Sequence, residues 1–177
     1  MQRVVRKDNI ILTGFMGTGK SVVGRTLATH LGYRLLDTDL LIEQEAGMSI
    51  AQIFAKKGEA HFRELEKHTI ARACLEKGVV IATGGGAMAN AVNAERLKAS
   101  GVVICLTASP EVIRQRIQGN SERPLLQGDE PLGKIRALLA ARAEAYAQAD
   151  ITVDTSALNV KEAVEAVLAA LGTHLGT

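Results

Sequence analysis

Residues 14–21 carry the clearest chemistry in the chain, because Gly-Phe-Met-Gly-Thr-Gly-Lys-Ser matches the phosphate-binding pattern G-x-x-x-x-G-K-[ST]. Glycines let backbone N–H groups approach phosphate oxygens closely, and a helix that follows adds partial positive charge. Lys20 is expected to reach the β- and γ-phosphates of a nucleotide, and Ser21 to offer its hydroxyl to Mg²⁺. The residues of this segment expected to bind ATP are Gly14, Met16, Gly17, Thr18, Gly19, Lys20, Ser21 and Val22.

Kinases, GTPases and motor ATPases all use such a loop, so other features must separate these classes. The chain contains neither an Asn-Lys-x-Asp guanine-recognition motif nor an Asp-x-x-Gly switch motif, which a GTPase would need. Its 177 residues leave no room for the extra domains of most motor ATPases. A small kinase is the favoured class.

Two carboxylates, Asp37 and Asp39, follow the second apolar segment. If the strand continues through them, their side chains share one face, because side chains alternate along a strand. One carboxylate would then hold Mg²⁺, directly or through water, and the other would orient an attacking hydroxyl or accept its proton. Alternatively, the pair caps a helix that begins near Leu40.

A triple glycine follows the third apolar segment, in the run Thr-Gly-Gly-Gly at 83–86. Gly84, Gly85 and Gly86 offer backbone N–H donors and close approach to a small ligand, although a simple turn would also explain them. Ligands of parallel α/β sheets bind beyond the carboxyl ends of the strands. The phosphate-binding loop, the aspartates and the glycines are therefore expected to meet at one edge of a sheet.

Two arginines lie on or beside the apolar stripes of predicted helices. Arg142 falls within the stripe of a helix predicted near 132–148, where an unpaired charge would be costly. Arg63 lies at the edge of a second stripe, although a surface ion pair with Glu66 would explain it equally well. Two inward-facing arginines suit the bidentate capture of a carboxylate.

A long loop is predicted at 119–131, where two of the three prolines lie and periodicity is weak. Arg123 precedes a proline there and could close over transferring phosphates, as part of a lid. Arg116 faces the same region from the preceding helix. A variable surface connection is the alternative.

These groups need a framework of strands and helices to bring them together. Short β-branched runs alternate with longer helical patterns, which indicates a mostly parallel α/β sheet. The predicted strands cover 9–13, 34–36, 79–82, 102–106 and 151–153, and the predicted helices cover 20–31, 59–76, 111–118, 132–148 and 160–171.

The composition is that of one globular domain, with 47% hydrophobic and 23% charged residues. A net charge of +2 and 3% aromatic residues argue against nucleic-acid binding through a basic face or stacking platforms. No apolar run reaches the roughly 18 residues that span a membrane. Cys74 and Cys105 lack metal-like spacing, which is typical of reduced thiols in a cytoplasmic protein.

Seven further motifs follow the phosphate-binding loop in collinear order, and the whole set resembles shikimate kinase. They are DTD at 37–39, GMSIAQIF at 47–54, FRELE at 62–66, TGGG at 83–86, RPLL at 123–126, ARAEAY at 141–146 and ADITVDT at 149–155. The resemblance implies the P-loop NTPase fold of nucleoside monophosphate kinases, with five parallel strands in the order 2-3-1-4-5 flanked by helices. It implies a single kinase domain over 1–177, with a substrate-binding subdomain at about 39–66 and a lid at about 119–131.

The resemblance also implies roles for single residues. Lys20, Asp39 and Arg123 would be catalytic, with Asp39 as the candidate base and Arg123 near the phosphates. Ser21 and Asp37 would hold Mg²⁺, and Arg116 would pack against adenine. The residues that would bind shikimate are Asp39, Arg63, Glu66, Gly84, Gly85, Gly86 and Arg142, with Ile50, Phe54 and Phe62 as apolar lining.

Two positions depart from the family pattern. Val22 stands where members often have a second hydroxyl residue, and 156–159 lack the arginines that some members place near adenine. Local contacts to the α-phosphate and the adenine are therefore expected to differ.

The sequence thus predicts a monomeric cytoplasmic enzyme that binds neither nucleic acid nor membranes. It would transfer the γ-phosphate of ATP to the 3-hydroxyl of shikimate with Mg²⁺, in aromatic amino-acid synthesis. One alternative is a kinase of another small hydroxy acid, such as gluconate. Another is a nucleotide-binding module without catalysis. This alternative is disfavoured because the residues expected for catalysis and metal binding are intact, namely Lys20, Ser21, Asp37 and Asp39.

Overall fold

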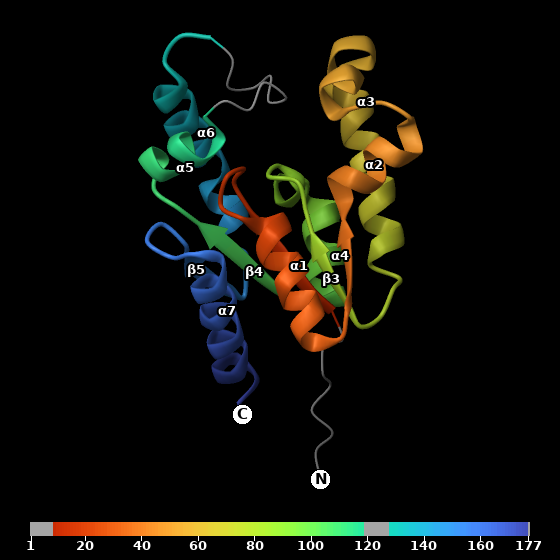
Figure 1. The fold of residues 1–177 in the computed structure, drawn as a ribbon. Coiled ribbons are helices and arrows are strands. Elements are labelled where there is room, and N and C mark those ends of the chain that lie inside the picture. Colours follow the sequence, from red (N-terminus) through yellow and green to blue (C-terminus); the bar gives the residue numbers. More distant parts are fainter. Residues whose placement is uncertain (1–8, 119–127, 177) are drawn as a thin grey trace.

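Five parallel strands form one sheet in the order β2-β3-β1-β4-β5 in the computed structural model, which describes residues 9–118 and 128–176 (Figure 1). The strands are β1 (Asn9–Gly14), β2 (Arg34–Asp37), β3 (Val79–Ala82), β4 (Gly101–Thr107) and β5 (Ile151–Asp154). This order confirms the predicted P-loop NTPase topology, and each strand lies within two residues of its predicted bounds.

Helices cover both faces of the sheet, which explains why the central strands are apolar throughout. Ile10 and Leu12 of β1 pack with α1 (Lys20–Leu31) and α7 (Val160–Leu175) on one face. Ile11, between them, points to the other face and packs with α3 (Ile50–Ala73) and α4 (Ala91–Ser100). The alternation of side chains along β1 therefore builds both halves of the core.

The chain after β2 decides between the two alternatives for Asp37 and Asp39, a continuing strand and a helix cap. The strand ends at Asp37 and α2 (Thr38–Ala46) begins at once, because the Asp37 carboxylate accepts hydrogen bonds from the backbone N–H groups of Asp39 and Leu40. The helix-capping alternative is thus correct for Asp37. Asp39 lies in the first turn of the helix rather than on a strand face.

The helix expected at 59–76 begins earlier, at Ile50, where Ser49 and Gln52 form a capping box. Gly58 interrupts it with a non-helical backbone (φ 83°, ψ 168°), so α3 consists of two helical parts joined at a kink. A further helix that was not predicted, α4, is capped by Asn90.

Two helical arms rise beyond the carboxyl edge of the sheet (Figure 1). On one side α2 and α3 pack around Ile42, Ile53 and Phe62. On the other, α5 (Pro110–Ile117) and α6 (Pro131–Tyr146) pack around Ile113 and Ile135. No helix within the described ranges is long and apolar enough to cross a membrane.

Candidate active site

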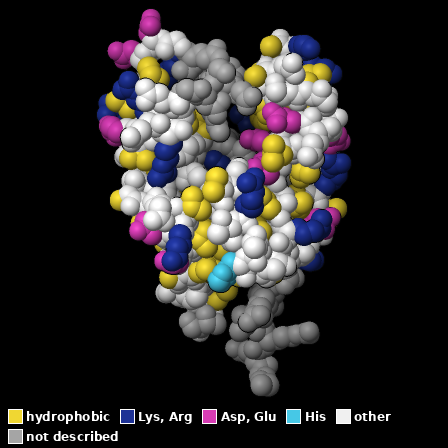
Figure 2. All heavy atoms as spheres, in the orientation of Figure 1, with side chains coloured by type: hydrophobic (Ala, Val, Ile, Leu, Met, Phe, Trp, Pro, Cys, Tyr) yellow, Lys and Arg dark blue, Asp and Glu magenta, His cyan; other side chains and the backbone are white. Residues whose placement is uncertain are grey.

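A cavity of about 430 Å³ opens between the two arms, at the carboxyl ends of β1, β2 and β3. Figure 2 shows the surface hollowed there, with acidic and basic side chains at its edge. The predicted site residues that line it are Met16, Gly17, Gly19, Lys20, Ser21, Val22, Asp37, Asp39, Arg63, Glu66, Gly84, Gly85, Gly86 and Arg142. The expected meeting of the three strand ends is therefore found.

The phosphate-binding loop joins β1 to α1 and is held by its own polar groups. The Lys20 ammonium donates to the carbonyl of Phe15 (2.8 Å), and the Thr18 hydroxyl donates to the same carbonyl (2.7 Å). Gly17 and Gly19 take positive φ values of 77° and 94°, which a side chain would strain. These internal hydrogen bonds and glycine angles define the curved backbone of the loop.

Ser21 and Asp37 meet although 16 positions separate them in sequence. The Ser21 hydroxyl donates to Asp37 Oδ2 (2.7 Å), while Oδ1 of the same carboxylate caps α2. One hydroxyl and one carboxylate beside a phosphate-binding loop match the oxygen ligands that Mg²⁺ takes. These two residues therefore fit the expected metal.

Two carboxylates face Gly84 from different helices. A Cβ on this glycine would lie 2.9 Å from Asp39 Oδ1 of α2 and 3.0 Å from Glu66 Oε2 of α3. Any side chain at this position would displace both groups. The glycine therefore allows two acidic side chains to gather at the cavity wall.

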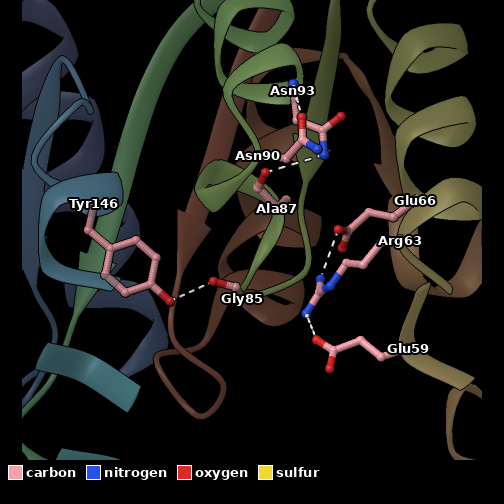
Figure 3. A network of polar contacts seen from close by, with 8 residues as sticks. All are labelled: Glu59, Arg63, Glu66, Gly85, Ala87, Asn90, Asn93 and Tyr146. Carbon is pink, nitrogen blue, oxygen red and sulfur yellow. Dashed lines mark hydrogen bonds and ion pairs between the residues drawn. The ribbon is translucent and has the colours of Figure 1, made fainter. Parts of the chain in front are cut away.

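Arg63 forms an ion pair with Glu66 (2.9 Å) and a second with Glu59 (3.4 Å), as Figure 3 shows. The pair is not the surface contact that the simpler explanation assumed, because the Glu66 side chain is only 1% exposed. Burial raises the pKa of the Glu66 carboxyl, against the opposing effect of Arg63. The Arg63 guanidinium also lies against the glycine turn, because a Cβ on Gly86 would be 2.8 Å from its Nη2.

Arg142 is buried on the inner face of α6, as predicted. Its guanidinium lies over the Phe15 ring, 5.4 Å from the centroid, and Nη1 would be 3.0 Å from a Cβ on Gly85. Within the described part of the chain, this Nη1 has no hydrogen-bond partner. A buried cationic donor at a cavity wall is suited to an anionic ligand.

Arg116 does not line the cavity but ties neighbouring loops together. Its guanidinium donates to the carbonyls of Gly17 (3.2 Å) and Thr155 (2.6 Å) and to the Thr155 hydroxyl (3.0 Å). Gly14 and Thr18 are likewise absent from the cavity wall. Gly14 is needed because a Cβ there would collide with the backbone of Leu106. Arg123 lies outside the described residues, as does 119–127 of the expected lid.

Several lining residues were not predicted as site residues. They are Leu40, Glu43, Ser49, Ala51 and Thr83. Glu43 is one helical turn beyond Asp39, so the spacing could have indicated it once α2 was recognised. Its carboxylate accepts from the N–H of Ile50 (2.9 Å) and joins α2 to α3.

A phosphate-binding loop, a hydroxyl–carboxylate pair and two facing arginines on this sheet define a P-loop kinase that uses ATP. The family model for shikimate kinase matches residues 16–172. The shikimate kinase of Caldanaerobacter subterraneus subsp. tengcongensis is 48% identical over 162 residues, 92% of this chain and 95% of the relative. The chain belongs to the shikimate kinase family.

Solved structures agree with this assignment. Shikimate kinase from Acinetobacter baumannii in complex with shikimate superposes with a TM-score of 0.88 at 40% identity, covering 96% of this chain and 93% of that one. A gluconokinase from Sinorhizobium meliloti 1021 superposes with a TM-score of 0.60 at 17% identity, covering 97% and 95%. The second likeness shows the shared fold alone.

Proposed function

We propose that this protein transfers the γ-phosphate of ATP to the 3-hydroxyl of shikimate, giving ADP and shikimate 3-phosphate, in aromatic amino-acid synthesis. The observation that carries the proposal is a single cavity in which a phosphate-binding loop faces Arg63 and Arg142. Two arginines from opposite arms suit a small carboxylate at one end, with ATP phosphates at the other. The relative whose structure contains shikimate supports this choice of acceptor.

Within this proposal, Arg63 and Arg142 hold the carboxylate of the acceptor, and the glycines of 84–86 allow it to approach the backbone. Asp39, which faces Gly84 beside Glu66, orients the attacking hydroxyl and accepts its proton. Lys20 neutralises charge on the moving phosphate, because phosphoryl transfer depends mainly on positioning and charge.

The nucleotide-associated metal of this kinase is proposed to be Mg²⁺, held by Ser21 and Asp37. When bound, the ion would neutralise phosphate charge. The remaining proposed ATP contacts come from 14–22, from Arg116 and from Arg123 of the lid at 119–131. Arg116 would offer its guanidinium plane to the adenine, held in place by Thr155 and Gly17.

The domain organisation, location and oligomeric state are part of the same proposal. A single kinase domain over 1–177, with 39–66 binding the acceptor, is consistent with the one sheet and its two arms. Cys74 and Cys105 are free thiols, which suits a cytoplasmic location. We expect a monomer that binds ATP and shikimate, and sedimentation at micromolar concentration tests this.

A coupled ADP-release assay with ATP and Mg²⁺ tests the function, with shikimate and gluconate as competing acceptors. We expect ADP release that depends on shikimate, with shikimate 3-phosphate as the product by mass spectrometry. If gluconate alone is phosphorylated, the protein is instead a kinase of another small hydroxy acid. If the protein binds ATP but phosphorylates neither acceptor, it is instead a nucleotide-binding module without catalysis.

A further inference from the structure

Tyr146 contacts the glycine turn from the side opposite Arg63. Its hydroxyl donates a 2.7 Å hydrogen bond to the carbonyl of Gly85, 61 positions away in sequence (Figure 3). The side chain is buried, and burial raises the pKa of its phenol to about 12. The phenol therefore keeps its proton at neutral pH and remains a donor.

The hydrogen bond fixes the direction of a whole peptide group. The bond between Gly85 and Gly86 is trans, so its C=O and N–H point in opposite directions. With the carbonyl held against Tyr146, the N–H of Gly86 is directed away from α6, toward the side on which Figure 3 places Arg63. The backbone hydrogen bond from the Ala87 N–H to the Gly84 carbonyl (3.2 Å) closes the turn around this peptide, and glycines at its two central positions would tolerate either orientation of the peptide, so the Tyr146 contact favours one of the two.

Tyr146 also lies one helical turn after Arg142 on α6, so both residues project from the same face. Arg142 Nη1 would lie 3.0 Å from a Cβ on Gly85, the residue whose carbonyl Tyr146 holds. One helix face thus sets the orientation of the glycine turn and supplies the buried guanidinium beside it.

We propose that Tyr146 is a positioning residue for the acceptor: it holds the Gly85 carbonyl so that the Gly86 N–H and the Arg142 guanidinium form one anion-binding surface. This inference rests on the proposed function, and it adds a residue that the proposed mechanism does not use. Tyr146 touches neither substrate nor phosphate in this scheme. It acts through the backbone of the glycine turn.

The test is Tyr146→Phe, with Tyr33→Phe as the matched control. Tyr33 is the other tyrosine of the chain and packs under α1 on the opposite face of the sheet. Loss of one buried hydrogen bond predicts a rise of about three- to tenfold in the KM for shikimate. The kcat and the KM for ATP should stay close to the wild-type values, because the carboxylate end is remote from the reacting hydroxyl.

A purely structural role would lower the Tm of Tyr146→Phe and leave the KM for shikimate unchanged, which would overturn the inference. Equal changes in the KM values for ATP and shikimate in Tyr146→Phe would also overturn the inference. Calorimetric titration of shikimate into each folded variant gives a second measurement, independent of turnover. If wild type turns over shikimate normally while Tyr146→Phe behaves like Tyr33→Phe, the proposed function stands and this inference fails. If the wild-type protein does not phosphorylate shikimate, both the proposed function and this inference fail.

Discussion

The Ser21 hydroxyl donates a 2.7 Å hydrogen bond to Asp37 Oδ2, joining the phosphate-binding loop to the end of β2. The same carboxylate caps α2 through its other oxygen. Asp37 therefore combines a structural task with a proposed metal-binding task. The two can be separated, because asparagine caps helices about as well as aspartate but lacks the negative charge.

Asp37→Asn should raise the Mg²⁺ concentration for half-maximal rate by about tenfold or more, the usual cost of losing a group that holds a metal. Its Tm should stay near that of wild type. Asp37→Ala removes the cap as well, and should lose a further ~1 kcal/mol of stability. Rates measured across a Mg²⁺ titration, with Tm values from circular dichroism, check both effects. An unchanged Mg²⁺ requirement in Asp37→Asn would limit Asp37 to capping.

Asp39→Asn should lower kcat by about 10²-fold or more, because the proposed base would be lost while the side-chain volume is kept. Glu45→Gln on the same helix is the control, since its carboxylate is exposed and pairs with Arg72. Steady-state rates at saturating ATP and shikimate measure the effect. Near-normal turnover of Asp39→Asn would show that this residue positions the acceptor without taking its proton.

Arg142→Ala should raise the KM for shikimate by roughly 10- to 100-fold, the range expected when hydrogen bonds to a charged group are lost. Arg142→Lys should recover little of this, because a lysine keeps the charge but not the bidentate geometry. Arg136→Ala is the matched control on α6, where Arg136 is exposed and pairs with Glu111 (2.6 Å). If Arg142→Ala matches Arg136→Ala in its KM for shikimate, Arg142 does not contact the acceptor.

Glu66 should make stability depend on pH. Burial raises the pKa of its carboxyl in the folded state, so the folded chain holds this proton to higher pH than the unfolded chain does. Stability from this group is present below the unfolded pKa and is lost as pH rises through the folded pKa. The Tm of wild type should therefore fall relative to that of Glu66→Gln as pH increases from about 4.

Thermal unfolding of both proteins across the acidic and neutral range checks this difference. Glu59→Gln is the control, because Glu59 pairs with the same Arg63 but is exposed. Parallel Tm curves for wild type and Glu66→Gln would mean that the carboxyl titrates alike in both states.

The local features of the site could be predicted from the sequence. The phosphate-binding loop, the glycine turn and the strands depend on residues close together in the chain, whose types restrict the backbone directly. Arg142 was also placed correctly, because one arginine within an apolar helical stripe must be buried with its neighbours. The motifs that resemble shikimate kinase pointed to the family that the comparisons confirm.

One missed helix and one open alternative came from short elements with little pattern. In α4 only Asn93, Ala94 and Leu97 are buried, so its apolar face is too narrow to be recognised in the sequence. For Asp37 and Asp39 the sequence left a continuing strand and a helix cap open, because nothing local shows that the Asp37 carboxylate turns back to cap α2. Both elements depend on contacts that a sequence pattern does not reveal.

The sequence by itself determined which residues could bind phosphate, carboxylate and metal, and that parallel strand ends would bring them to one edge. Only the tertiary structure decided which of them are buried and, apart from the Arg63–Glu66 pair that the spacing already offered, which of them meet. Glu66 is buried beneath Arg63, Ser21 reaches Asp37, and Tyr146 holds Gly85. The physical reason is that periodicity describes one element at a time. Burial and hydrogen-bond geometry arise where several elements, distant in sequence, pack against each other.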